Sequence, residues 1–181
     1  MKKFILTTLF IFTLISIQAQ EINWVTLDKA LELQKKNPKK IIMDVYTNWC
    51  GPCKLLDKNT FHNKDVVAYV NENYYAVKFN AEGNSTIQYK DQSFGNPRYD
   101  ANKANTRNSS HQFSSYMGIR AYPTIVFMNE QGDFIMPIPG YRTPQQLELF
   151  LKMFKNNDHK KMTSKEKFEE YYNAFKPTFV N

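Results

Sequence analysis

The chain has 181 residues, of which 42% are hydrophobic and 15% aromatic, which is typical of one globular domain and excludes a disordered chain. Its formal net charge is +7, from basic residues that are scattered except for small clusters at 35–40 and 159–161. Nucleic-acid binding favours a basic stripe with stacking aromatic residues, so this pattern indicates a solvated surface and no nucleic-acid partner.

Residues 1–19 have the pattern of a secretory signal peptide. Lys2 and Lys3 precede an apolar run over residues 4–17, and Ala19 is a small residue suited to cleavage. An uncleaved anchor is the alternative, but the run is shorter than the ~20 residues that span a bilayer. We therefore expect cleavage after Ala19, membrane contact only through that signal, and a mature protein in the periplasm or secreted.

The chain after the signal alternates helix and strand patterns. Helical spacing predicts a helix within residues 25–40 that Asn37 and Pro38 stop, and β-branched residues predict a buried strand next. The second cysteine opens a helical stretch, and Pro144 begins a later helix. In chain order, the further predictions are strands at 41–47, 75–80, 123–129 and 134–138, and helices at 53–61, 63–74 and 143–154.

The order of these elements predicts an α/β protein. Strands joined through helices come first, and a hairpin with its turn at 131–133 follows, so the sheet is expected to be mixed and flanked by helices. Pro137 and Pro139 fit an edge strand or the end of a strand. A capping-box pattern from Thr163 to Glu166 predicts a last helix that ends near Phe175.

Residues 81–117 form a loop that is too long for an ordinary connection. They are rich in Gly, Asn, Ser and Pro, and they exceed the ~15 residues usual within a compact domain. Such a segment is functional, mobile or partly helical. Its interspersed aromatic residues are Phe94, Tyr99, Phe113 and Tyr116.

The only two cysteines, Cys50 and Cys53, lie in the stretch NWCGPCK. A C-x-x-C pair can be a redox couple, half of a zinc site, a haem attachment point or a structural staple. Zinc needs two more ligands, and the three histidines do not form an H-x₃₋₅-H pair. Haem attachment needs a histidine where Lys54 stands. A disulfide that closes so short a loop removes little chain entropy, so a staple is a poor explanation.

A redox couple has the parts it needs in this stretch. A strand ends and a helix starts at the first cysteine, so unpaired backbone N–H groups and the helix dipole favour the Cys50 thiolate. Cys53 lies one helical turn later on the same face and can release a mixed disulfide. Pro52 fixes φ where its missing N–H has no consequence. We expect neither a metal nor another cofactor.

The sequence WCGPCK is identical to the thioredoxin active-site motif, and the chain resembles the thioredoxin-fold family over roughly residues 24–155. Thioredoxins keep a buried aspartate six residues before the first cysteine, here Asp44, and a lysine partner, here Lys78. The stretch AYPT resembles the loop that holds their cis-proline, here Pro123. Gly140 matches the glycine that lets a substrate chain approach.

The resemblance implies a role for each of these residues. Cys50 attacks the client disulfide and Cys53 resolves the intermediate. Asp44 relays the Cys53 proton, because burial raises the pKa of this carboxyl while Lys78 lowers it toward neutrality. A tolerated buried ion pair between Asp44 and Lys78 is the alternative.

The resemblance also implies a substrate groove beside the cysteines. A cis bond at Pro123 would expose the backbone of Tyr122 to an extended client strand. Tyr122 stands where thioredoxins usually have a small apolar residue, and Asn48 stands where an acidic residue is common, so potential and specificity stay open. The expected groove residues are Trp49, Gly51, Pro52, Tyr122, Pro123 and Gly140.

The 81–117 loop is some 25 residues longer than its counterpart in plain thioredoxin and leads directly into the cis-proline loop. It is interpreted equally as a lid or partner surface and as a small satellite core. The predicted organisation is a signal at 1–19, a thioredoxin-like domain at 20–156 with the inserted loop, and a helical extension at 157–181 that packs as decoration.

Together these features predict an exported, monomeric protein-disulfide oxidoreductase that acts on client proteins with disulfides. Gly51 and Pro52 between the cysteines resemble reducing thioredoxins, so a reductase fed by a membrane electron donor is favoured. An oxidase or isomerase is the alternative within the class. A binding module with a vestigial redox site is the alternative outside it.

Overall fold

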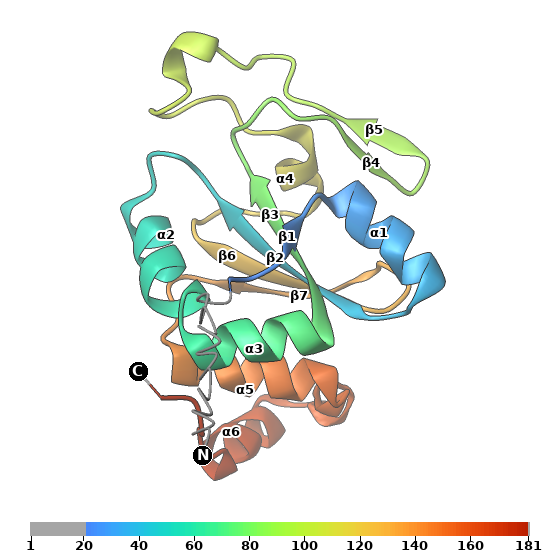
Figure 1. Ribbon diagram of the computed structural model, residues 1–181, viewed down its shortest axis with the longest axis vertical. Helices are drawn as coiled ribbons and strands as arrows, with labels where there is room; N and C mark the ends of the chain where they lie inside the picture. Colours follow the sequence, from blue (N-terminus) through green and yellow to red (C-terminus); the bar gives the residue numbers. More distant parts are fainter. Residues whose placement is uncertain (1–20, 181) are drawn as a thin grey trace, which may run out of the picture.

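A five-stranded mixed sheet runs through the centre of the protein, with strand order β1-β3-β2-β6-β7 (Figure 1). The computed structural model describes residues 21–180. The strands β1, β3 and β2 are parallel, while β6 is antiparallel to β2 and β7 is antiparallel to β6. The strands are β1 (Trp24–Val25), β2 (Lys40–Tyr46), β3 (Tyr74–Asn80), β6 (Thr124–Met128) and β7 (Phe134–Pro139). The predicted α/β class and mixed sheet are confirmed.

Helices cover both faces of this sheet. Figure 1 shows α1 and α4 on one face, and α2, α3 and α5 on the other, with α6 beyond α5. A single π-helical turn, Asp57–Phe61, continues α2. The helices are α1 (Leu27–Lys36), α2 (Gly51–Leu56), α3 (Lys64–Asn73), α4 (Gln112–Tyr116), α5 (Pro144–Lys155) and α6 (Lys165–Ala174).

The hydrophobic core has two halves, one on each face of the sheet. Side chains alternate along a strand, so Ile42 of β2 packs toward α3 and α5, while Ile41 and Met43 pack toward α1. All three side chains are fully buried. The near-continuous burial of β2 explains why its sequence is apolar without alternation.

The predicted elements lie within two residues of the observed ones, but the start of the last helix was assigned wrongly. Ser164, and not Thr163, is the N-cap of α6, and its hydroxyl accepts from the Lys167 N–H. The N–H of Thr163 donates to the Lys161 carbonyl, so Thr163 still belongs to the preceding turn. At α5, Pro144 lies in the first turn as predicted, and Thr143 forms a capping box with Gln146 that was not predicted.

The long segment between β3 and β6 contains a hairpin that the sequence did not predict. Strands β4 (Ile87–Tyr89) and β5 (Gln92–Phe94) pair antiparallel, and a 3₁₀ turn at Ala101–Lys103 and helix α4 follow. Phe94 and Phe113 are buried and pack against one another at 5.3 Å between ring centroids. Phe94 and Phe113 therefore extend the half of the core under α1, and the 49% exposed Tyr116 contacts both of their rings from outside.

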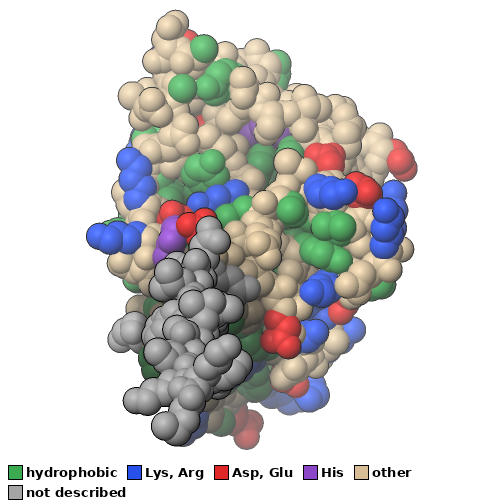
Figure 2. Space-filling model, viewed as in Figure 1, with side chains coloured by type: hydrophobic (Ala, Val, Ile, Leu, Met, Phe, Trp, Pro, Cys, Tyr) green, Lys and Arg blue, Asp and Glu red, His purple; other side chains and the backbone are tan. Residues whose placement is uncertain are grey.

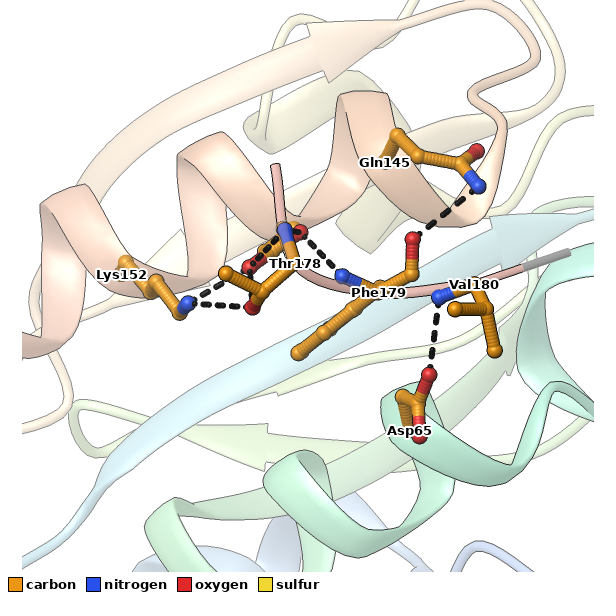
Figure 3. Close-up of polar contacts among 7 residues, drawn as sticks. Asp65, Gln145, Lys152, Thr178, Phe179 and Val180 are labelled. Carbon is orange, nitrogen blue, oxygen red and sulfur yellow. Dashed lines mark hydrogen bonds and ion pairs between the residues drawn. The ribbon is translucent and has the colours of Figure 1, made fainter. Parts of the chain in front are cut away.

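Hydrogen bonds fasten the C-terminal tail to α5 and to α3, and Figure 3 shows Thr178, Phe179 and Val180 of the tail beside these helices. Glu148 has no exposed side-chain surface, and it accepts hydrogen bonds from the backbone N–H groups of Thr178 and Phe179 and from Lys152 Nζ. The N–H of Val180 donates to Asp65 on α3. The partners of Glu148 compensate for the cost of burying its negative charge inside the protein.

None of the helices within residues 21–180 is both long and apolar enough to cross a bilayer. The predicted signal peptide and its cleavage point at Ala19 lie outside the described residues. On the face shown in Figure 2, Lys and Arg side chains are scattered among acidic ones and form no stripe.

Candidate active site

The two cysteines lie where β2 ends and α2 begins. Cys50 is the N-cap of α2, and it forms a disulfide with Cys53. The Cys53 N–H donates to Cys50 Sγ at 3.1 Å. Both residues are at most 5% exposed. The helix start therefore directs an N–H group at the Cys50 sulfur, an arrangement that stabilises a thiolate there once the disulfide is reduced.

Asp44 is a buried carboxylic acid on the same face of β2 as the cysteine helix. It is 2% exposed, and its Oδ1 has no hydrogen-bond partner among residues 21–180. Burial raises the pKa of Asp44 from 3.8 to about 7, against the opposing effect of the Lys78 cation and with a further increase from the Asp57 carboxylate. Asp44 is therefore poised to exchange a proton near neutral pH.

Lys78 forms its ion pair with a residue that the sequence analysis did not single out. Lys78 lies opposite Asp44 in the β2–β3 register, but its Nζ contacts Oδ1 of Asp57 in the π-helical turn after α2. The Lys78 ammonium also lies over the rings of Trp24 and Tyr46, at 5.2 and 5.8 Å. Asp57 follows Cys53 by four residues, so helical spacing alone would have placed it on the same face.

A polar cavity of about 460 Å³ joins these groups. Its lining includes Cys53, Asp44, Asp57 and Lys78, and Figure 2 shows acidic, basic and histidine side chains together on the surface beside α2. The hydroxyl of Thr47, which also lines the cavity, has no hydrogen-bond partner among the described residues. Cys53 and Asp44 thus open onto the same cavity.

Contacts also join several of the predicted groove residues to one another. The Tyr122–Pro123 peptide bond is cis, and the N–H of Gly140 donates to the Pro123 carbonyl at 2.7 Å. Gly140 has φ +88°, a conformation that favours glycine. The Trp49 and Tyr122 rings meet edge to face at 6.2 Å. The structure also leaves Gly51 and Pro52 exposed beside the disulfide.

The long loop packs directly on Trp49. The indole N–H donates to Glu82 at 2.7 Å, and the same carboxylate oxygen accepts from the Asn108 N–H at 2.8 Å. The guanidinium of Arg107 lies over the indole ring, 4.7 Å from its centroid. Asn48 donates to the Ala104 carbonyl at 2.7 Å. No periodic pattern pointed to Glu82 or Arg107, because both lie in irregular segments of the chain.

A family model described as a thioredoxin-like domain matches residues 27–155. The chain belongs to the thioredoxin-like domain family. The predicted family and the thioredoxin fold are thereby confirmed. A search of curated proteins finds no match.

Solved structures of thioredoxin-fold proteins resemble the chain over most of its length. An oxidoreductase named DsbH matches with 14% identity and a TM-score of 0.53, covering 86% of this chain and 94% of that one. A thioredoxin-fold protein from Helicobacter pylori matches with 17% identity and a TM-score of 0.55, covering 75% and 83%. A putative disulphide isomerase from Bacteroides thetaiotaomicron matches with 25% identity and a TM-score of 0.50, covering 76% and 93%.

The thioredoxin-like domain carries an intact cysteine pair at the start of α2, joined as a disulfide. The protein is a thioredoxin-like thiol–disulfide oxidoreductase, and proteins of this kind act on substrate proteins that contain disulfides. The structure brings the predicted residues together in two groups. Asp44 and Lys78 line one cavity with Cys53, and Trp49 and Tyr122 are in ring contact.

Proposed function

We propose that the protein is an exported disulfide reductase that acts on client proteins in the cell envelope. The observation that carries this proposal is the unaltered WCGPC motif at a helix start, with a buried acid of raised pKa on the cavity behind Cys53. The proposed catalytic residues are Cys50, Cys53, Asp44 and Lys78. The proposed groove residues are Trp49, Gly51, Pro52, Tyr122, Pro123 and Gly140.

The exchange proceeds in two steps. The Cys50 thiolate attacks one sulfur of the client disulfide, that disulfide breaks, and the first client thiol leaves while a mixed disulfide forms. Asp44 then takes the proton of Cys53, and the Cys53 thiolate attacks Cys50 Sγ. The second client thiol leaves, and the Cys50–Cys53 disulfide seen here remains. Two electrons have passed to the client, and a membrane-bound dithiol donor would restore them.

Substitution of each cysteine separately tests this assignment. Cys53→Ser keeps the attacking thiol and removes the resolving one, so the variant should accumulate mixed disulfides with clients. Cys50→Ser is the matched control, and we expect it to trap none and to be inactive in insulin reduction. Equal trapping by the two variants, or trapping by neither, would contradict the assignment of Cys50 as nucleophile.

The direction of electron flow has one competing assignment. The resemblance to a putative disulphide isomerase at 25% identity supports an isomerase or oxidase as the second candidate. The reduction potential of the Cys50–Cys53 couple, followed by Trp49 fluorescence in dithiol buffers, separates them. A value near about −270 mV would fit a reductase, one near about −180 mV an isomerase, and one near about −120 mV an oxidase.

Export and organisation are part of the same proposal. The signal at 1–19 is removed after Ala19, the domain at 20–156 carries the inserted loop at 81–117, and the extension at 157–181 completes a monomeric mature protein. The mass of the protein recovered from the envelope fraction tests this organisation. A full-length mass, or retention in the cytosol, would overturn the export.

A further inference from the structure

The segment 95–110 of the long loop lies against the ring that borders the active-site cysteines. Its contacts with the site are a hydrogen bond from Asn48, the hydrogen bonds of Glu82 to both Trp49 and Asn108, and the Arg107 guanidinium over the Trp49 ring. Trp49 in turn meets the ring of Tyr122, which precedes the cis-proline. The segment therefore forms an additional surface next to Trp49, beyond the proposed groove.

That surface is basic. Three exposed cations, Arg98, Lys103 and Arg107, line a cavity of about 450 Å³ and are called the basic shelf below. Asp100 is the only acid among the residues that line it. Its carboxylate already accepts from the Asn102 N–H and pairs with Lys103 at 3.9 Å. Neither Arg98 nor Arg107 has an acidic partner within residues 21–180, so the shelf carries unneutralised positive charge.

We propose that the basic shelf binds an acidic segment of the client protein close to its disulfide. This inference rests on the proposed function, and it names the class of client that the site prefers. Guanidinium groups bind carboxylates through paired hydrogen bonds, and an unpaired guanidinium in a concave surface presents those donors without first breaking an internal ion pair. Exposed positive charge also speeds the approach of an acidic partner.

The distance between shelf and cysteines suits one continuous client segment. Trp49 is the neighbour of Cys50 in the chain, and Arg107 lies directly on the Trp49 ring. An extended chain advances about 3.3 Å per residue, so a client whose cysteine reaches Cys50 places residues only a few positions away over the shelf. The preference should therefore be for Glu or Asp near the client cysteine.

The test compares two disulfide peptides that differ only in three residues beside one cysteine, Glu in one and Gln in the other. We expect the wild-type protein to reduce the Glu peptide with at least tenfold higher kcat/KM at low salt, and this preference should shrink at 0.5 M salt. In Arg98→Gln/Lys103→Gln, which leaves Arg107 on Trp49, the ratio should fall close to one through a raised KM for the Glu peptide. Lys165→Gln/Lys167→Gln on α6 is the charge-matched control and should keep the wild-type ratio.

The other outcomes distinguish failure of the basic shelf from failure of the proposed function. Equal reduction of both peptides by the wild-type protein would overturn the shelf and leave the proposed function standing.

If neither peptide is reduced, the proposed function fails, and the shelf is judged by binding alone. For that measurement, the oxidised protein is titrated with the Glu peptide whose cysteines are replaced by Ser, and Trp49 fluorescence reports occupancy. A response lost in Arg98→Gln/Lys103→Gln supports the shelf, and no response overturns it. Shelf-dependent binding to anionic vesicles without a peptide preference would also overturn it.

Discussion

Replacing Asp44 by Asn should stabilise the oxidised protein at pH 8 by about 4 kcal/mol. The pKa of this carboxyl is about 7 in the folded protein against an ordinary value of 3.8, a difference of about three units at about 1.36 kcal/mol each. The cause is burial of an acid whose Oδ1 has no hydrogen-bond partner among the described residues. Asn has nearly the same shape but no charge to bury.

The sign follows from the protons that each state binds. Between pH 3.8 and 7 the unfolded chain has released the Asp44 proton while the folded protein still holds it, so the folded state loses stability as pH rises through this window. Below 3.8 both states are protonated, and Asp44 contributes nothing. Above pH 7 Asp44 is ionised in both states, and the loss of folding stability that it causes has reached its full value. The advantage of Asp44→Asn should therefore grow from near zero at pH 4 to its maximum above pH 7.

Urea unfolding of the oxidised protein at intervals between pH 4 and 8 measures this advantage as the difference between variant and wild type, which cancels the carboxylates they share. Asp91→Asn is the control, since Asp91 is exposed and its αL turn conformation suits Asn. It should stay within about 0.5 kcal/mol of wild type at every pH. A difference for Asp44→Asn that does not change between pH 4 and 8 would refute the reasoning.

Two further predictions concern other carboxylates. Asp57→Asn removes the partner of Lys78 and a charge that raises the pKa of Asp44, so the pH step described above should move to lower pH; an unmoved step would exclude coupling through Asp57. Glu148→Gln should destabilise the protein by about 1–3 kcal/mol at pH 7, because charge-assisted bonds to the C-terminal tail are lost. The tail bonds and Lys152 outweigh burial and lower the pKa of Glu148, so its contribution should be present above pH 4.5 and fade as pH falls below it. Urea midpoints measure this, and the exposed Glu169→Gln serves as control.

The central sheet could be predicted because its signals are local. Strand β2 is a run of apolar residues that ends directly before the cysteine motif, and α5 has a Thr143 cap, a proline in its first turn and a helical apolar face. In such segments burial, propensity and capping favour one structure. The resemblance to thioredoxins then supplied Asp44 and Pro123, which no periodicity would have revealed.

The β4–β5 hairpin escaped prediction because its turn has unusual residues. Lys90 and Asp91 adopt φ of 48° and 60°, the left-handed conformation that two-residue hairpin turns require and that Asn-Gly usually supplies. A Lys-Asp pair does not predict that left-handed conformation. The packing of Phe94 and Tyr89 against Phe113 stabilises the hairpin instead, and those contacts join residues about 20 positions apart.

The ion pairs of the site also depended on tertiary structure. Lys78 has Asp44 beside it in register on the neighbouring strand, and the resemblance assigned it that partner. The π-helical turn brings the half-buried carboxylate of Asp57 to the same ammonium, and pairing there avoids burying two charges together. Sequence spacing along β3 does not predict the contact between Lys78 and Asp57.

The long loop contacts both sides of the cysteine pair, and this decides how its residues should be tested. Asn105 lines the cavity that holds Asp44 and Cys53, while Arg107, two residues later, lies on Trp49 in the groove. A substitution at either position would change packing next to the cysteine pair, so its effect on turnover would not by itself identify client recognition. Arg98 and Lys103 lie on the shelf without contacting the Trp49 ring or lining that cavity. Their substitution changes the charge that a client meets and preserves the packing around the disulfide, so a change in client preference would report recognition itself.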